Sequence, residues 1–171
     1  MDKGILLKAK QGDKACLAQI FDNYLDRVYR YIYIRIHNKE TAEDLASTVF
    51  IKVIEHIHKL DVDKNFEAWL FTITRNTLID MLRKNRFVSS NEMIEIAEDS
   101  TDHEDRSDNQ MVIERIKEKF DNLKELEREI VELTYFAQLN DKEISLVVGK
   151  PPGNIRVVRF RAIKKLRKSL E

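Results

Sequence analysis

The sequence predicts an all-α protein made of two small helical domains joined by a flexible acidic linker. Apolar residues recur at helical spacing through most of both halves of the 171-residue chain, and only four residues are glycine. Within residues 89–109, eight acidic residues stand against Arg106 alone, and large apolar side chains are few. Such a segment buries too little apolar surface to fold by itself. We therefore expect domains at 1–88 and 111–171, with the linker at 89–110.

The first domain begins with two predicted helices. Residues 6–36 carry apolar side chains at core spacing, and we expect a break near Gly12. Thr41-Ala-Glu-Asp44 resembles a capping box and predicts the start of the second helix. An apolar stripe continues from there to Leu60, which indicates that this helix packs along one face.

A third predicted helix, from Phe66 to about Arg86, is apolar on two sides and must therefore lie between neighbours. Its remaining strip is polar and basic, and two explanations stay open for it. The strip could contact phosphates and base edges, or it could be an ordinary solvated face, which this helix alone would favour. The strip consists of Thr72, Arg75, Asn76, Ile79, Arg83 and Arg86.

The second domain has the pattern of a helix-turn-helix. Asn122-Leu-Lys-Glu125 and Asn140-Asp-Lys-Glu143 each predict a helix start of the capping-box kind. Gly149 suits a left-handed helix end, and Pro152 suits the first turn of the next helix. A short helix, a tight turn and a basic helix follow in the order that a reader of the DNA major groove needs.

The last helix is apolar on one face and cationic on the other. From Lys150 onward, eight basic residues stand against the single acid Glu171, a formal charge of +7. The linker carries −7, so a neutral overall composition hides two opposite charge blocks. The linker could imitate nucleic acid or shield the basic helix, or it could simply keep a spacer soluble. The exposed face of the last helix should include Arg156, Val157, Phe160, Arg161 and Lys164.

Composition excludes several classes of protein. No apolar run approaches the length of a membrane span, and the N-terminus lacks a signal-peptide pattern, so we expect a cytoplasmic protein without membrane insertion. Cys16 is the single cysteine and cannot form an internal disulfide. There is no glycine-rich phosphate loop, no metal-ligand cluster and no nucleophile-base pair, so we expect no enzyme and no cofactor.

The motifs resemble those of the bacterial RNA polymerase sigma factors of the extracytoplasmic-function class (group 4) in the sigma-70 family. Glu43-Asp44-Leu45 and Val49-Phe50 resemble the helix of region 2 that docks on the clamp of the largest polymerase subunit. The pattern from Phe66 through Trp69 to Arg83 resembles the region 2 helix that melts and reads the −10 element. The resemblance thereby implies Glu43, Asp44, Leu45 and Phe50 in polymerase binding and Asn76 in −10 binding. Thr72, Arg75 and Arg83 share the polar strip with Asn76, so we predict −10 binding for them as well.

The C-terminal half resembles region 4 of the same family, which binds the −35 element and the flap of the second-largest polymerase subunit. The resemblance rests on Leu126, Arg128, the segments 143–145 and 149–156, and Phe160-Arg161-Ala162. It implies −35 contacts for the exposed face of the last helix. Val157 replaces a serine that is usual there, which predicts contact with a thymine methyl group. The family also implies an anti-sigma factor as partner.

Two other classes of protein stay open on sequence grounds. A free-standing helix-turn-helix regulator would share the C-terminal half, but it would leave the clamp-like helix and the pattern from Trp69 to Arg83 unexplained. A helical adaptor that binds polymerase without reading DNA would share the N-terminal half. The resemblance implies a sigma factor that directs core polymerase to promoters. The neutral overall charge then suits a subunit that binds promoter DNA only after docking on polymerase.

Overall fold

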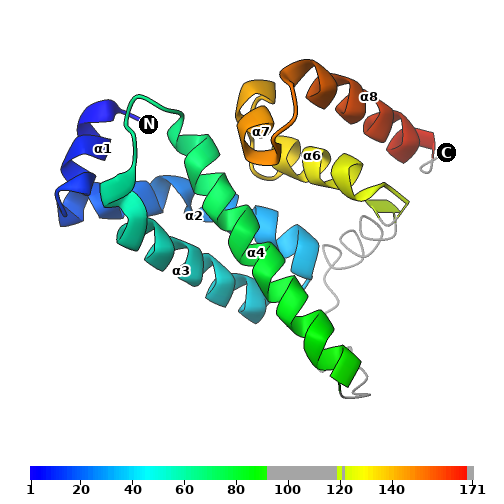
Figure 1. The fold of residues 1–171 in the computed structure, drawn as a ribbon, viewed down its shortest axis with the longest axis horizontal. Coiled ribbons are helices and arrows are strands. Elements are labelled where there is room, and N and C mark those ends of the chain that lie inside the picture. Colours follow the sequence, from blue (N-terminus) through cyan, green and yellow to red (C-terminus); the bar gives the residue numbers. More distant parts are fainter. Residues whose placement is uncertain (92–118, 121, 169–171) are drawn as a thin grey trace.

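The computed structural model describes residues 1–91, 119–120 and 122–168, and every regular element in them is helical (Figure 1). A long helix, α4, crosses the N-terminal helices, and the shorter helices α6, α7 and α8 lie in the described part of the C-terminal half. The elements are α1 (Lys3–Lys10), α2 (Lys14–Ile36), α3 (Lys39–His56), the short 3-10 turn η1 (Ile57–Lys59), α4 (Phe66–Asn91), α6 (Glu125–Tyr135), α7 (Asp141–Val148) and α8 (Pro152–Lys168).

Local capping explains the helix boundaries in the N-terminal half. The predicted break near Gly12 is confirmed: Gly12 has a φ of +85°, and the Asp13 carboxylate accepts a hydrogen bond from the Cys16 amide at 2.8 Å. The capping box predicted at Thr41 is wrong. Asn38 caps α3 instead, because its side-chain oxygen accepts from the Thr41 amide at 2.9 Å.

The C-terminal half confirms one predicted capping box and corrects the other. The Asn140 side chain accepts from the amide of Glu143, and the Glu143 carboxylate accepts from the Asn140 amide at 2.8 Å. Gly149 then ends α7 in the left-handed region, at a φ of +68°. The box predicted at Asn122 is wrong, because α6 begins at Glu125.

The N-terminal core forms where α2, α3 and α4 meet. Val28, Ile32, Val49 and Phe71 have no exposed surface, and Tyr31 meets Phe71 edge to face. The prediction that α4 is apolar on two sides is confirmed, since it packs on α3 along one side and on α7 along another. It extends to residue 91, past the predicted end. Residues 92–110 of the predicted linker lie outside the described part of the chain.

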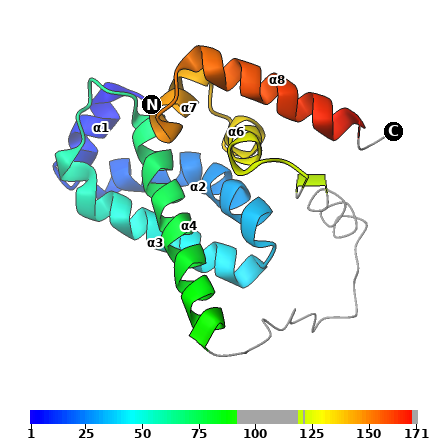
Figure 2. The same ribbon diagram turned by 45° about the vertical axis from the view of Figure 1, so that its right-hand side comes forward.

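The two halves are docked on each other, which the sequence did not predict. One continuous cluster of buried apolar side chains includes Leu70 and Phe71 of α4 together with Ile130 and Leu133 of α6 and Ile144 of α7. Figure 2 shows α6 and α7 beside α2 and α4, with α8 on the outer side. The two predicted helical domains are present, and α6 and α7 form the contact between them.

Candidate nucleic-acid and polymerase interfaces

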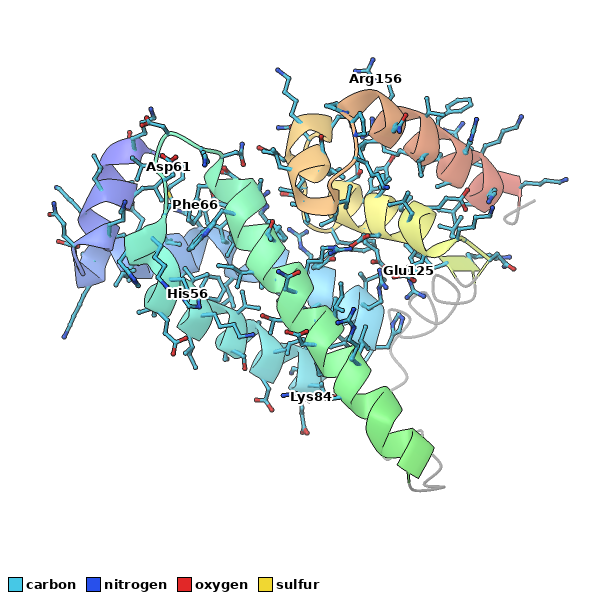
Figure 3. All side chains as sticks on the ribbon, in the orientation of Figure 1. His56, Asp61, Phe66, Lys84, Glu125 and Arg156 are labelled. Carbon is cyan, nitrogen blue, oxygen red and sulfur yellow. The ribbon has the colours of Figure 1, made fainter. Side chains whose placement is uncertain are left out.

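Helix α8 presents the residues predicted for −35 binding on one open face. Ile155 and Ala162 are completely buried and fix the orientation of the helix on α6 and α7. The opposite side is exposed, and it includes all five candidates: Arg156, Val157, Phe160, Arg161 and Lys164. Phe160 is 70% exposed and Val157 is 48% exposed, which is unusual for large apolar side chains without a partner. Arg156 points away from the N-terminal half (Figure 3).

One arginine of α8 has a structural role. Arg159 binds Asp141 through both terminal guanidinium nitrogens, Nη1 and Nη2, and so ties α8 to the first turn of α7. Arg156 lies 3.5 Å from the same carboxylate, from its Nε to Asp141 Oδ2, but its side chain is 79% exposed. Arg156 is therefore held near the helix start while its guanidinium stays open to solvent, which suits a group that must reach DNA.

The four residues predicted for −10 binding on α4 have two different environments. Asn76 and Arg83 are exposed. Thr72 is half-buried, and its hydroxyl donates to the Ala68 carbonyl at 2.7 Å. Arg75 binds Glu129 of α6, with Nη2 3.3 Å from Oε2 and its Nε on Oε1. The docked C-terminal half thus occupies part of the predicted surface.

A cavity of about 570 Å³ opens at the start of α4, beside the loop that precedes it. Trp69, Ala68 and Thr72 line its α4 side, and Leu146 of α7 borders it with 63% of its surface exposed. Asn65 also lines the cavity and donates to Glu143 at 3.2 Å. The cavity adjoins an aromatic ring and polar side chains, which are the groups that hold an unstacked base. Sequence reasoning assigned no −10 base pocket.

The four residues predicted for polymerase binding are divided between the surface and the core. Glu43 and Asp44 are exposed on α3, whereas Leu45 is 8% and Phe50 is 5% exposed. Phe50 packs edge to face on Phe21 of α2, with ring centroids 4.8 Å apart. Leu45 and Phe50 therefore support this surface from within.

A groove between α2 and α3 adds residues that sequence reasoning missed. It has a volume of about 590 Å³, with Phe21, Leu25 and Tyr29 on its floor and acidic side chains at its rim. Ile51 and Ile54 of α3 are 56% and 55% exposed. Both lie off the predicted apolar stripe of α3. An apolar residue outside that stripe was the sequence signal that could have identified them. The acidic rim consists of Asp22, Asp26 and Glu43.

An ion-pair network joins α2 to α6 where the two halves meet. Arg35 donates from Nε to both carboxylate oxygens of Glu132, at 3.1 and 3.0 Å, and from Nη1 to Glu125 at 2.6 Å. Arg128 of α6 donates to the same Glu132 at 2.7 Å. Burial raises the pKa of the Glu132 carboxyl, and the two guanidinium groups oppose that shift. Burial disfavours the charge on Arg35, but its carboxylate partners outweigh this and raise its pKa.

None of the helices described above has an apolar stretch of the length that crossing a bilayer requires. Among the residues that the structure describes, no group of three His, Cys, Asp or Glu side chains is arranged to hold a metal ion. The candidate surfaces combine charged, amide, aromatic and aliphatic side chains, which are groups that can bind nucleic acid or protein.

Two family models match the chain in the order that the helices suggest. A model of sigma-70 region 2 matches residues 20–88, and a model of sigma-70 region 4 matches residues 120–168. The chain is 31% identical to the ECF RNA polymerase sigma factor SigM of Bacillus subtilis, over 87% of this chain and 91% of that protein. It is 29% identical to SigW of the same organism, over 99% and 97%.

A further relative is the ECF sigma factor BldN of Streptomyces coelicolor. The identity is 32% over 95% of this chain, which spans 63% of the length of BldN. The chain therefore belongs to the sigma-70 family of bacterial RNA polymerase sigma factors. Within that family it is an extracytoplasmic-function (ECF) sigma factor, a non-enzymatic subunit that binds core RNA polymerase and directs promoter-specific initiation of transcription.

Two solved structures share the fold. CnrH, solved in complex with the cytosolic domain of CnrY, superposes with a TM-score of 0.75 at 20% identity, over 99% of this chain and 96% of CnrH. RpoE of Bartonella quintana, solved with the anti-sigma factor NepR, gives a TM-score of 0.69 at 24% identity, over 90% and 95%. At these identities the likeness shows the fold alone.

Proposed function

We propose that this sigma factor binds the −35 element through the outer face of α8 and the unpaired −10 strand through α4. The observation that supports this most strongly is the exposed face of α8. Three cationic side chains, Arg156, Arg161 and Lys164, share it with Val157 and Phe160, while the opposite face is fixed in the core. An arginine can bind guanine at two points, worth roughly 1–3 kcal/mol of discrimination, and Val157 suits a thymine methyl group.

On α4, Asn76 and Arg83 are exposed on the same strip as Thr72 and Arg75. We assign the cavity beside Trp69 to a base that leaves the stack, because the indole ring can pack against the base and the polar residues of the lining can hydrogen-bond the base edge. Trapping such a base favours the open promoter, so this part of the chain would assist melting without any chemical step.

For polymerase binding, we propose the groove between α2 and α3 as the surface that meets the clamp of the largest subunit. Exposed Ile51 and Ile54 with the floor of the groove supply apolar area, and the acidic rim with Asp44 favours a basic partner. Leu45 and Phe50 would act by supporting the groove. For the flap of the second-largest subunit, we propose the C-terminal half as a whole.

We further propose an anti-sigma factor as a partner, acting in the cytoplasm. The support is the Bartonella quintana relative of similar fold, which was solved with one. The domain limits of 1–88 and 111–171, and the path of the acidic linker, stay predictions.

The experiment that tests the proposal is run-off transcription with bacterial core RNA polymerase on a fragmented genomic library of the host, with the 5′ ends sequenced. New start sites that depend on this protein should follow a shared pair of elements near −35 and −10. Start sites without a shared upstream element would overturn the −35 assignment. Repeating the map with Arg156→Ala should abolish most sites, whereas Lys14→Ala, an exposed change on the other half, should leave them.

A further inference from the structure

Three arginines of the N-terminal half bind acceptors of the C-terminal half, and we call them the arginine seam: Arg27, Arg35 and Arg75. Arg35 binds Glu132 and Glu125, and Arg75 binds Glu129. Arg27 donates from Nε to the Ala137 carbonyl oxygen at 2.9 Å. All the acceptors belong to α6 or to the turn that follows it. The seam therefore brings a row of negative oxygen atoms against cationic groups of α2 and α4.

The contact at Arg75 has the geometry of a phosphate contact. Two nitrogens of one guanidinium meet the two oxygens of the Glu129 carboxylate. Arginine binds carboxylate and phosphate in the same forked manner. Glu129 is 6% exposed, so its charge faces Arg75 with little water between them. Arg75 can serve a DNA phosphate only when Glu129 has left.

The two sides of the seam differ in what remains when they separate. Glu132 keeps Arg128 of its own helix, 2.7 Å away, so its charge stays compensated. Glu129 would become exposed to water. Arg75 would lose its carboxylate partner while it stays on the strip of α4 that includes Asn76. Opening would thus leave an unpaired cation at the surface that we assign to the −10 strand.

We infer that α6 takes the place of DNA on α4 in the free protein. There Glu129 binds the guanidinium of Arg75, and in the open complex a phosphate of the −10 strand binds the same guanidinium. The inference rests on the proposed role of α4. The free chain would therefore bind single-stranded DNA weakly, and the separation of the two halves would create the second promoter contact. The device needs no partner, because both sides of the contact belong to this chain.

The test compares two substitutions on the same helix that remove the same charge. Glu129→Gln weakens the contact with Arg75. Glu127→Gln removes a carboxylate whose partner, Lys165, lies within the C-terminal half at 2.6 Å. A fluorescent short single-stranded DNA of degenerate sequence is titrated with each full-length protein at low salt, and anisotropy reports binding. Replacing a charged hydrogen-bond partner by a neutral one should tighten binding roughly fivefold for Glu129→Gln.

The gain must depend on Arg75. Adding Arg75→Gln to Glu129→Gln should return the affinity to that of the unchanged protein. The inference is overturned if Glu129→Gln binds no better than the unchanged protein, if Glu127→Gln gains equally, or if the gain survives the loss of Arg75. Run-off transcription with core polymerase separates this failure from failure of the proposed function. If the unchanged protein still initiates from sites with a shared −10 element, the proposed function stands and only the inference that α6 takes the place of DNA on α4 is wrong.

Discussion

The two surfaces that we assign to DNA differ in how far other helices cover them. The outer face of α8 has no covering element among the described residues, and Phe160 there is 70% exposed. The polar strip of α4 is partly covered, since α6 supplies Glu129 to Arg75 and α7 borders the cavity beside Trp69. The comparison teaches that a sequence motif locates a binding strip, whereas its availability depends on which other helix packs on it.

The largest effect expected is on the contact that keeps the halves together. Glu132→Ala should lower the free energy of unfolding by roughly 3 kcal/mol, because two half-buried guanidinium groups lose the fully buried carboxylate that they share. Glu125→Ala is the matched change, since Glu125 also binds Arg35 but is 76% exposed, whereas Glu132 is fully buried. It should cost less than about 1 kcal/mol. Urea denaturation measures both, and equal losses would contradict the described seam.

Substitutions on the outer face of α8 should change how strongly and how selectively the holoenzyme binds promoters. On promoters obtained from the run-off map, Arg156→Ala should weaken holoenzyme binding roughly 10- to 100-fold, the worth of one two-point guanine contact. Arg156→Lys keeps the charge but cannot form the fork, so it should preserve salt dependence and lose discrimination at one −35 position. If lysine restores full discrimination, Arg156 contacts phosphate only.

A smaller change is expected at Val157. Val157→Ser should reduce the preference for thymine at one −35 position severalfold, a loss of about 1 kcal/mol of apolar contact. Val158→Ser is the matched control, because Val158 is half-buried and packs on the core. It should lower thermal stability without moving any base preference. Unchanged preference at every −35 position in Val157→Ser would remove the methyl contact from the account.

The smallest expected effect is on how the free energy of unfolding depends on pH. A hydrogen bond from Lys165 lowers the pKa of Glu127 below its ordinary 4.5. A depressed carboxyl pKa stabilises the folded state at higher pH, and this contribution disappears as the pH falls from about that value through the folded pKa. Lys165 is 45% exposed, so the contribution should be under about 1 kcal/mol. Unfolding measured at neutral and acid pH should show a shallower loss for Glu127→Gln, and an unchanged slope would contradict this.

Local patterns predicted most of the elements but not their docking. The break near Gly12, the cap at Asn140 and the exposed face of α8 each depend on a few neighbouring residues, so they can be read from the sequence. The pair of Arg75 with Glu129 joins residues 54 apart, and that of Arg35 with Glu132 joins residues 97 apart. Helical periodicity relates only residues a few positions apart, so it cannot predict contacts between residues this far apart in the sequence.

The predicted polymerase residues show the same limit. The motif at Glu43 to Phe50 lies on one helix, but it combines exposed acidic side chains with the buried Leu45 and Phe50. Burial of Phe50 depends on Phe21 of another helix, which the motif does not contain. The exposed Ile51 and Ile54 were visible in the sequence as apolar positions off the stripe. The role that we propose for them depends on the groove between α2 and α3, which no pattern within one helix predicts.

The most direct test of the account is the distance between the two halves, with and without core polymerase. In a Cys16→Ser background, Asn23→Cys on α2 and Lys142→Cys on α7 carry a donor and an acceptor dye, because both positions are exposed and lie near the contact of Arg27 with the Ala137 carbonyl. Run-off transcription confirms that the labelled protein is active. We predict efficient energy transfer in the free chain and a clear loss of transfer when core polymerase and promoter DNA are added. Unchanged transfer in an active transcription complex would mean that α4 reads DNA while still docked on α6, which would contradict the account.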